Sequence, residues 1–325
     1  MALYLTEEDV NELLTMDAAV DVLEKAFLAQ AEGKAGNAAR VRLHLGTGDS
    51  NTMSAVAPTL GVMGLKTYGV VPGYPTRMYV VISSTHTGEL LALLEASRMG
   101  EIRTGAASGV ATKYMARQDA SSVGVLGSGA YAPDQLLAVC AVRDIGSVKV
   151  FSRTPERRER FAADMSAKLG IDVSAVESAE ACVRDVDVLI TITNSPTAVF
   201  SGEWLSPGTH INAAGAMRPT RRELDDEAVR RANVIVTDDV DQAKHECGDL
   251  IYPIEGRLLE WEQVHNLWEV VAGTKPGRNA DSDITLFESQ GMALEDIAAC
   301  IRVYELATQK GVGQELKIRA PAAAR

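Results

Sequence analysis

The pattern of apolar and polar positions divides the 325-residue chain into three stretches. Residues 6–32 carry apolar side chains at helical spacing, and Val20, Leu23, Phe27 and Leu28 are predicted to form one buried stripe. Residues 40–95 change to short apolar runs separated by glycine and proline, which predicts strands joined by turns. The predicted strands are 40–45, 62–70, 78–83 and 90–94, and an Ala- and Gly-rich helix is predicted over 102–115.

From Ser122 onward, predicted strands alternate with predicted helices. The strands are expected at 123–126, 148–151, 186–193, 210–214 and 234–237, and the helices at 133–142 and 155–169. Thr154 precedes the second of these helices and is its expected N-cap. This alternation predicts an α/β fold with a central, doubly wound parallel sheet of the Rossmann type. A final apolar helix at 293–308 is expected to pack back on the N-terminal part, making that part a discontinuous α+β domain.

Composition excludes several classes of function. The formal net charge of −12 disfavours nucleic acid and anionic membranes as partners. The sequence has no apolar run long enough to span a bilayer, and its first residues lack the features of a signal peptide. The four cysteines (Cys140, Cys182, Cys247 and Cys300) match no zinc spacing, so we expect reduced thiols, no bound metal and a cytoplasmic location.

The strongest local signal for a cofactor is the segment Gly127-Ser128-Gly129-Ala130-Tyr131-Ala132. It has the pattern G-x-G-x-x-A and lies between a predicted strand and a predicted helix. Gly127 permits a sharp turn, Gly129 lets the backbone approach a pyrophosphate, and Ala132 lets the helix lie close to the sheet. The free N–H groups at the helix N-terminus then face the phosphates. The segment predicts a dinucleotide site.

The end of the second predicted strand favours NADPH, with NADH as the alternative. An acidic residue there would bind a ribose 2′-hydroxyl and repel a 2′-phosphate. This chain instead has Ser152-Arg153-Thr154, with Arg157 one turn into the next helix. An arginine pairs with phosphate through charge-assisted hydrogen bonds, and the two hydroxyl groups can donate to it.

Several further stretches occur in an order that is specific. They are Gly64-Leu65-Lys66, the segment 102–108, the segment 202–212, and Arg218-Pro219 followed by 222–226. With these stretches, residues 40–299 resemble the ornithine cyclodeaminase/mu-crystallin family. Residues 202–226 are most similar to its mu-crystallin-like ketimine reductase branch.

The resemblance implies a domain organisation and a site. It implies a substrate-binding and dimerisation domain at 1–118 completed by a C-terminal helix at 296–325, a dinucleotide-binding Rossmann domain at 119–295, and a homodimer. It also implies that Arg40, Lys66 and Arg103 hold the carboxylate of a small substrate beside the nicotinamide, with Lys66 and Arg103 as catalytic residues. Arg42 is an alternative to Arg40. The implied cofactor contacts are Thr104, Gly127, Ser128, Gly129, Ala130, Tyr131, Ser152, Arg153, Thr154, Arg157, Thr191 and Thr193.

The chemistry of these residues supports the assignment. An arginine fork can hold a planar carboxylate through two hydrogen bonds and so fix the neighbouring carbon over the nicotinamide. Lys66 lies within an apolar run, where a buried ammonium group needs an anion or loses its proton. A structural ion pair remains the alternative for Arg40.

Some positions depart from the family. Cyclodeaminases carry an acidic residue where this chain has Met217, and a thioether cannot exchange protons. Tyr131 replaces the usual glutamine of the phosphate turn, and Arg77 replaces an uncharged residue. His210 is interpreted as a strand residue, and Asp225-Asp226 as a solvated helix start.

The leading hypothesis is a ketimine reductase. NADPH would deliver hydride to the imine carbon of a small 2-carboxy imine, such as pyrroline-2-carboxylate or piperideine-2-carboxylate. The enzymatic alternatives are an alanine-type amino-acid dehydrogenase, a cyclodeaminase and the reduction of an open-chain imino acid. Met217 weighs against the first two. A mu-crystallin-like ligand-binding protein without turnover is the non-enzymatic alternative.

Overall fold

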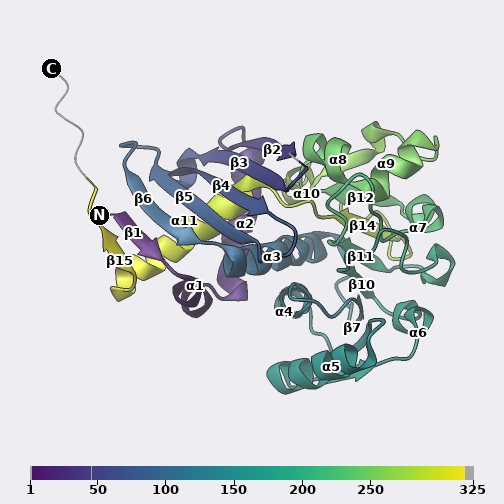
Figure 1. Ribbon diagram of the computed structural model, residues 1–325. Helices are drawn as coiled ribbons and strands as arrows, with labels where there is room; N and C mark the ends of the chain where they lie inside the picture. The colour runs from purple at the N-terminus through teal and green to yellow at the C-terminus, as the bar shows by residue number, and fades with distance from the viewer. Residues whose placement is uncertain (1, 45, 319–325) are drawn as a thin grey trace.

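The computed structural model describes residues 2–44 and 46–318, which form two sheets flanked by helices (Figure 1). The first sheet has the strand order β15-β1-β6-β5-β4-β3-β2. Its strands are β1 (Ala2–Leu5), β2 (Gly36–His44), β3 (Asp49–Ala57), β4 (Val62–Val70), β5 (Arg77–Ser84), β6 (Leu90–Glu95) and β15 (Gln314–Leu316). Strands β2 to β6 pair antiparallel with their neighbours, whereas β1 runs parallel to β6.

The second sheet is parallel throughout and has the order β13-β12-β14-β11-β10-β7-β8-β9. Its strands are β7 (Ser122–Leu126), β8 (Ser147–Phe151), β9 (Asp172–Ala175), β10 (Val188–Thr191), β11 (His210–Ala213), β12 (Val234–Thr237), β13 (Val264–Asn266) and β14 (Thr285–Glu288). Strand β7 lies where the order reverses, with β8 on one side and β10 on the other. Ligands of open α/β sheets bind at the carboxyl ends of the strands beside such a reversal.

Helices complete both layers. They are α1 (Glu7–Leu13), α2 (Met16–Ala31), α3 (Ser97–Met115), α4 (Ala132–Val142), α5 (Pro155–Leu169), α6 (Ala179–Val183), α7 (Asp226–Arg231), α8 (Val240–Glu246), α9 (Gly248–Glu255), α10 (Leu267–Val271) and α11 (Ala293–Lys310), with 3-10 turns at Pro58–Leu60, Gly202–Trp204 and Trp261–Gln263. None of the helices in the described ranges is long and apolar enough to cross a membrane.

Helix α11 returns to the first sheet, as the sequence predicts. It packs on β3, β4 and α2 (Figure 1). Its buried side chains share one core cluster with those of β1, β3 to β6 and α3. The opposite face of the sheet stays open. Strand β3 shows the division, because its residues alternate between buried and exposed along the whole strand.

Helix α3 joins the two layers. It packs on α2 and α11 of the first layer and on α4 and β11 of the second. Gly105 permits the close approach of α3 to α4, since a Cβ there would lie 2.4 Å from the carbonyl oxygen of Asp134. Arg143 then caps the C-terminal end of α3 by donating to the carbonyls of Thr112, Lys113 and Ala116.

Several predicted elements differ from the structure. Residues 6–32 form two helices, because Thr15 begins α2 by accepting a hydrogen bond from the backbone N–H of Ala18. Val20, Leu23 and Phe27 are buried as predicted, whereas Leu28 was wrongly placed in the stripe and is 40% exposed. Leu28 lies off the helix face that contacts α3 and α11, since the buried positions follow the other side of α2.

The third helix begins earlier than predicted, at Ser97 rather than residue 102. Its first N–H groups are capped from outside the helix, because the Glu7 carboxylate accepts hydrogen bonds from the N–H groups of Ser97 and Arg98. Thr154 precedes α5 as predicted but makes no side-chain cap. Pro155 lacks an N–H and Arg157 N donates to the carbonyl of Thr154, so fewer free donors remain for the hydroxyl.

Candidate active site

The phosphate turn follows β7 and begins α4. Gly127 has φ of 119°, and a Cβ there would lie 2.3 Å from the carbonyl oxygen of Ile192, so this position requires glycine. A Cβ on Gly129 would meet nothing within 4 Å. Gly129 therefore leaves open space above the N-terminus of α4, where a pyrophosphate would lie. Ala130 is exposed beside it, and Ala132 is fully buried.

The neighbouring strand end supplies hydroxyl groups and arginines. Ser128 Oγ donates to Ser152 Oγ at 2.9 Å, and Ser152 Oγ donates to the carbonyl of Thr154. Arg153 and Arg157 are exposed and form no ion pair with any described residue. These two arginines follow β8, at the position where the sequence predicts the adenosine end of a cofactor.

Three threonines predicted near the cofactor have internal partners. Thr104 Oγ1 donates to the carbonyl of Gly100. Thr191 Oγ1 donates to Glu223, which also accepts the N–H groups of Thr193 and Gly215. Glu223 thus ties together the carboxyl ends of β10 and β11, and burial raises its pKa.

Lys66 lies on the face of β4 that α11 covers, next to Met53 of β3 and Val80 of β5. Its side chain is 3% exposed, and Nζ donates to Asp296 Oδ1 at 3.0 Å. Burial lowers the pKa of Lys66, and Arg103 adds to this effect while Asp296 opposes it. The sequence expectation that this lysine needs an anion is met by Asp296 at the start of α11.

Arg103 projects from α3 toward the same carboxylate. Its Nε donates to Asp296 Oδ1 at 2.9 Å, and Nη1 donates to Glu295 Oε2 at 2.7 Å. Burial disfavours the charge, but Asp296 and Glu295 outweigh it and raise the pKa of Arg103. Nη2 has no hydrogen-bond partner among residues 2–44 and 46–318, so its N–H donors are uncommitted there.

Arg40 reaches the same region from β2. It pairs with Glu246 and donates to the carbonyls of Gln290 and Gly291 at 3.0 and 3.2 Å. Arg42 shares Glu246 at 3.0 Å and is more exposed, with 21% of its side chain accessible against 3% for Arg40. Arg40 therefore occupies the more buried of the two positions. Its ion pair with Glu246 is of the kind named above as the alternative, structural role for this residue.

The loop that receives Arg40 also contacts Arg103. A Cβ on Gly291, which has φ of 69°, would lie 2.3 Å from Arg103 Nη1. The backbone N–H groups of Gln290 and Gly291 donate to Asp238, whose pKa burial raises to about 6. The three predicted cations, Arg40, Lys66 and Arg103, therefore lie around the loop at residues 290–291 and the first turn of α11.

Sequence reasoning missed the acidic partners of these cations. Glu295 and Asp296 are 1% and 0% exposed, and Glu246 is 5% exposed. Burial raises the pKa of Glu295 to about 8, with Arg103 opposing this shift. A signal was present, because adjacent acids in the first turn of an otherwise apolar, buried helix require cationic partners.

Other singled-out residues are structural or peripheral. His210 is fully buried between Thr285 and Asn212, and burial lowers its pKa to about 3, so it is a neutral strand residue as interpreted. Asp225 caps α7 and Asp226 is exposed. Met217 is 40% exposed.

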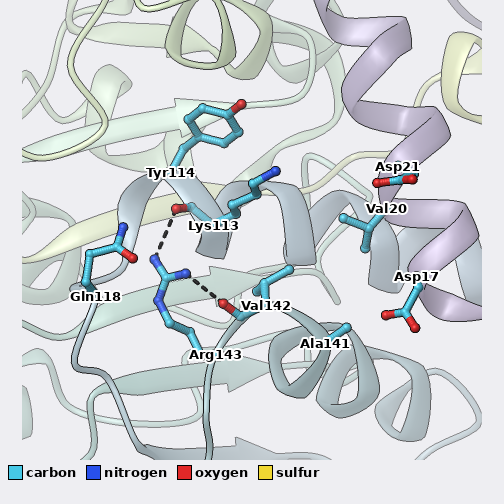
Figure 2. A pocket seen from close by; sticks show the side chains of 9 residues that line it. All are labelled: Asp17, Val20, Asp21, Lys113, Tyr114, Gln118, Ala141, Val142 and Arg143. Atoms are coloured by element: carbon cyan, nitrogen blue, oxygen red, sulfur yellow. Dashed lines mark hydrogen bonds between the residues drawn. The ribbon is translucent and has the colours of Figure 1, made fainter.

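A surface pocket of about 600 Å³ lies away from this site, between α2 and the C-terminal ends of α3 and α4 (Figure 2). The residues that line it are Asp17, Val20, Asp21, Lys113, Tyr114, Gln118, Ala141, Val142 and Arg143. Its two cations are engaged, since Lys113 pairs with Glu24 and Arg143 donates to backbone carbonyls. None of the predicted site residues lines this pocket.

Known proteins share both the sequence and the fold. The sequence model of the ornithine cyclodeaminase/mu-crystallin family matches residues 2–311. A Delta(1)-pyrroline-2-carboxylate reductase of Bacillus cereus is 40% identical over 272 residues, covering 82% of this chain and 83% of that protein. The alanine dehydrogenase of Archaeoglobus fulgidus is 38% identical over 323 residues, covering 97% and 98%.

The structure also matches that of Thermococcus litoralis Delta(1)-pyrroline-2-carboxylate reductase in complex with NADH and L-proline. The TM-score is 0.92 at 36% identity, covering 97% of this chain and 100% of the other. Sequence motifs, fold and overall similarity agree, and the chain belongs to the ornithine cyclodeaminase/mu-crystallin family.

Proposed function

We propose that this protein is an NAD(P)H-dependent reductase of the C=N bond in a small 2-carboxy imine. Cyclic ketimines such as pyrroline-2-carboxylate or piperideine-2-carboxylate are the proposed substrates, by similarity to the Delta(1)-pyrroline-2-carboxylate reductases of Bacillus cereus and Thermococcus litoralis. The observation that carries the proposal is the pair of buried cations, Lys66 and Arg103, which share Asp296 beside a dinucleotide turn.

The charges of this cluster favour an anionic ligand. Lys66 and Arg103 both donate to Asp296, and burial raises the pKa of Glu295, which disfavours a second negative charge beside them. A substrate carboxylate supplies a further acceptor for these cations, accepts from Arg103 Nη2 and so fixes the adjacent imine carbon.

The residues fit a bound nicotinamide cofactor, which when bound supplies the hydride. Gly129 and the N-terminus of α4 fit its pyrophosphate, and β7 lies at the strand reversal where such cofactors bind. The chain supplies orientation and charge. Hydride addition to a protonated imine consumes no further proton at carbon or nitrogen, so the thioether of Met217 is compatible with this reaction.

The test is a panel of substrates assayed with the purified protein and reduced nucleotide. Cyclic ketimines with a 2-carboxylate are expected to be turned over, and Arg103→Ala is expected to lower kcat/KM by about a hundredfold or more, from the loss of charge-assisted hydrogen bonds. Arg160→Ala is the control, because its side chain is 85% exposed. Consumption of nucleotide only with pyruvate and ammonia, or no turnover at all, contradicts the proposal.

Alanine-type dehydrogenation is the second candidate, because the Archaeoglobus fulgidus relative spans nearly the whole chain. Oxidative release of ammonia requires a water molecule to be activated by a base. Met217 cannot serve as that base. The same panel separates the two reactions, and binding of imino acids without turnover would favour a ligand-binding protein.

We infer that the cofactor preference is NADPH over NADH. Arg153 and Arg157 are exposed and unpaired within the described chain, and the segment 152–155 carries no acidic residue. Arg153→Ser is expected to raise KM for NADPH by about 10- to 100-fold while leaving KM for NADH within about twofold. Arg160→Ser, on the helix α5 that begins two residues after Arg153, is the control. A native enzyme that prefers NADH contradicts the inference.

We propose that a second copy of this chain covers the open face of the first sheet. Four apolar side chains are exposed there: Val41 (58%), Leu43 (64%), Val56 (40%) and Leu65 (38%). Large exposed apolar patches mark interaction sites. Leu43→Glu is expected to convert a dimer to a monomer in sedimentation velocity, and Leu258→Glu, at a residue 43% exposed elsewhere, is the control. A native monomer contradicts the proposal.

We further propose the domain division 1–118 with 296–325, and 119–295. The two separate sheets support it, since the strands of the first lie within 1–118 or 296–325 and those of the second within 119–295; residues 1, 45 and 319–325 lie outside the described residues. A cytoplasmic location is also proposed, since none of the four cysteines forms a disulfide. Limited proteolysis tests the division, and cell fractionation tests the location.

A further inference from the structure

Tyr131 belongs to the phosphate turn, yet its hydroxyl group lies at the cation site. The residue precedes α4, two positions after Gly129. Its ring extends toward α3, because a Cβ built on Gly100 would lie 3.9 Å from Tyr131 Oη. The same point lies 3.4 Å from Lys66 Nζ and 3.8 Å from Met78 Sδ. The hydroxyl and the ammonium group therefore flank one small patch of α3.

The hydroxyl has no hydrogen-bond partner among the described residues, although polar groups lie nearby. Burial raises the pKa of Tyr131, while Arg103 opposes this shift. The phenol is thus neutral at physiological pH and remains a hydrogen-bond donor. Lys66 and Arg103 each direct donors to Asp296 or Glu295. The Tyr131 hydroxyl adds an uncharged donor to this cluster, beside Arg103 Nη2, which also has no partner among the described residues.

We propose that the Tyr131 hydroxyl donates a hydrogen bond to the carboxylate of the imine substrate, beside Lys66. The inference rests on the proposed reductase function and adds a substrate-contacting residue to it. A neutral donor next to two cations is suited to an anion, because it adds a hydrogen bond without adding charge repulsion. An imine nitrogen that is already protonated has no lone pair to accept that bond.

The position of Tyr131 has a further consequence. One turn would contact the pyrophosphate through Gly129 and the substrate through Tyr131. Nucleotide binding would then order the residue that completes the carboxylate site, so carboxylate affinity is expected to rise when the nucleotide is bound.

The experiment compares Tyr131→Phe with the unaltered protein. We expect kcat/KM for pyrroline-2-carboxylate to fall about 10- to 100-fold, as for loss of a hydrogen bond to a charged group. Binding of pyrrole-2-carboxylate, a planar substrate analogue to be tested as an inhibitor, to the nucleotide complex is expected to weaken by a similar factor, whereas the Kd of reduced nucleotide stays within about twofold. Tyr252→Phe, whose ring stacks on Arg222 at 5.5 Å, is the control.

Each outcome decides the matter. Unchanged inhibitor affinity in Tyr131→Phe overturns the inference, whether or not kcat falls. Equal loss of nucleotide affinity also overturns it, because the residue would then serve the cofactor. If the unaltered protein reduces no imine, the proposed function fails, but inhibitor binding still tests the contact with the carboxylate.

Discussion

Replacing Asp296 by asparagine removes the charge that Lys66 and Arg103 share. The side chain keeps its size and one acceptor oxygen, while Asp296 is fully buried and lies 3.0 Å from Lys66 Nζ and 2.9 Å from Arg103 Nε. Breaking a buried ion pair from one side costs about 3–5 kcal/mol, since a buried charge is left without its partner.

A second way to estimate this loss of stability gives a similar value. Lys66 can escape the uncompensated charge by losing its proton. Holding a lysine neutral at pH 7 costs about 1.4 kcal/mol for each of roughly 3 pH units below its ordinary pKa, or about 4–5 kcal/mol. Both routes predict a loss of about 4 kcal/mol in the free energy of unfolding, and a fall in Tm on the order of 10 °C.

The pH dependence gives the sharper test. In Asp296→Asn the pKa of folded Lys66, already lowered by burial, falls further below its value in the unfolded chain. Between those two pKa values the unfolded chain binds more protons, so stability rises with pH. The stability difference between variant and native protein is therefore expected to narrow from pH 7 to pH 9, by at most about 1.4 kcal/mol per pH unit.

Thermal unfolding followed by circular dichroism at several pH values measures both effects. Asp164→Asn is the control, because it breaks an exposed pair with Arg160 and is expected to change stability by less than about 0.5 kcal/mol. The reasoning is refuted if Asp296→Asn matches this control, or if its stability deficit is constant across the pH range.

Three glycine variants test the geometry of the site. Gly129→Ala is expected to leave Tm within about 1 °C, because no described atom is near its Cβ, but to weaken nucleotide binding at least tenfold in a fluorescence titration. Gly127→Ala is expected to lower Tm as well, because its Cβ would meet Ile192 O at 2.3 Å and φ is positive. Gly291→Ala would displace Arg103 Nη1, so KM for the imino acid is expected to rise more than tenfold while nucleotide affinity is kept. Equal stability of the first two variants, or an unchanged KM in the third, would contradict these assignments.

Local chemistry made part of the molecule predictable. The phosphate turn consists of adjacent residues, and its geometry requires small side chains at fixed positions. In the structure Gly127 has a positive φ and Ala132 is fully buried, as this requirement predicts. The parallel sheet followed from alternating apolar runs. Strand β3 was not predicted because it has no continuous apolar run. Its exposed face carries the polar residues Ser50, Thr52 and Ser54, which interrupt the apolar residues of the strand.

Contacts between segments far apart in the sequence could not be predicted from local patterns. Lys66 was expected to need an anion, but Asp296 follows it by 230 positions and no spacing rule connects them. The start of α3 depends in the same way on Glu7, which lies 90 positions before Ser97. Both cases are tertiary interactions that override local propensity.

The first turn of α11 has a consequence for the synthesis of this protein. Glu295 and Asp296 leave the ribosome long after Lys66 and Arg103, and until then those cations have no carboxylates from α11 beside them. A chain that ends before α11 therefore lacks the carboxylate partners of Lys66 and Arg103, and it also lacks the apolar helix face that completes the core of the first sheet. The cation cluster can assemble only after almost the whole chain has been synthesised.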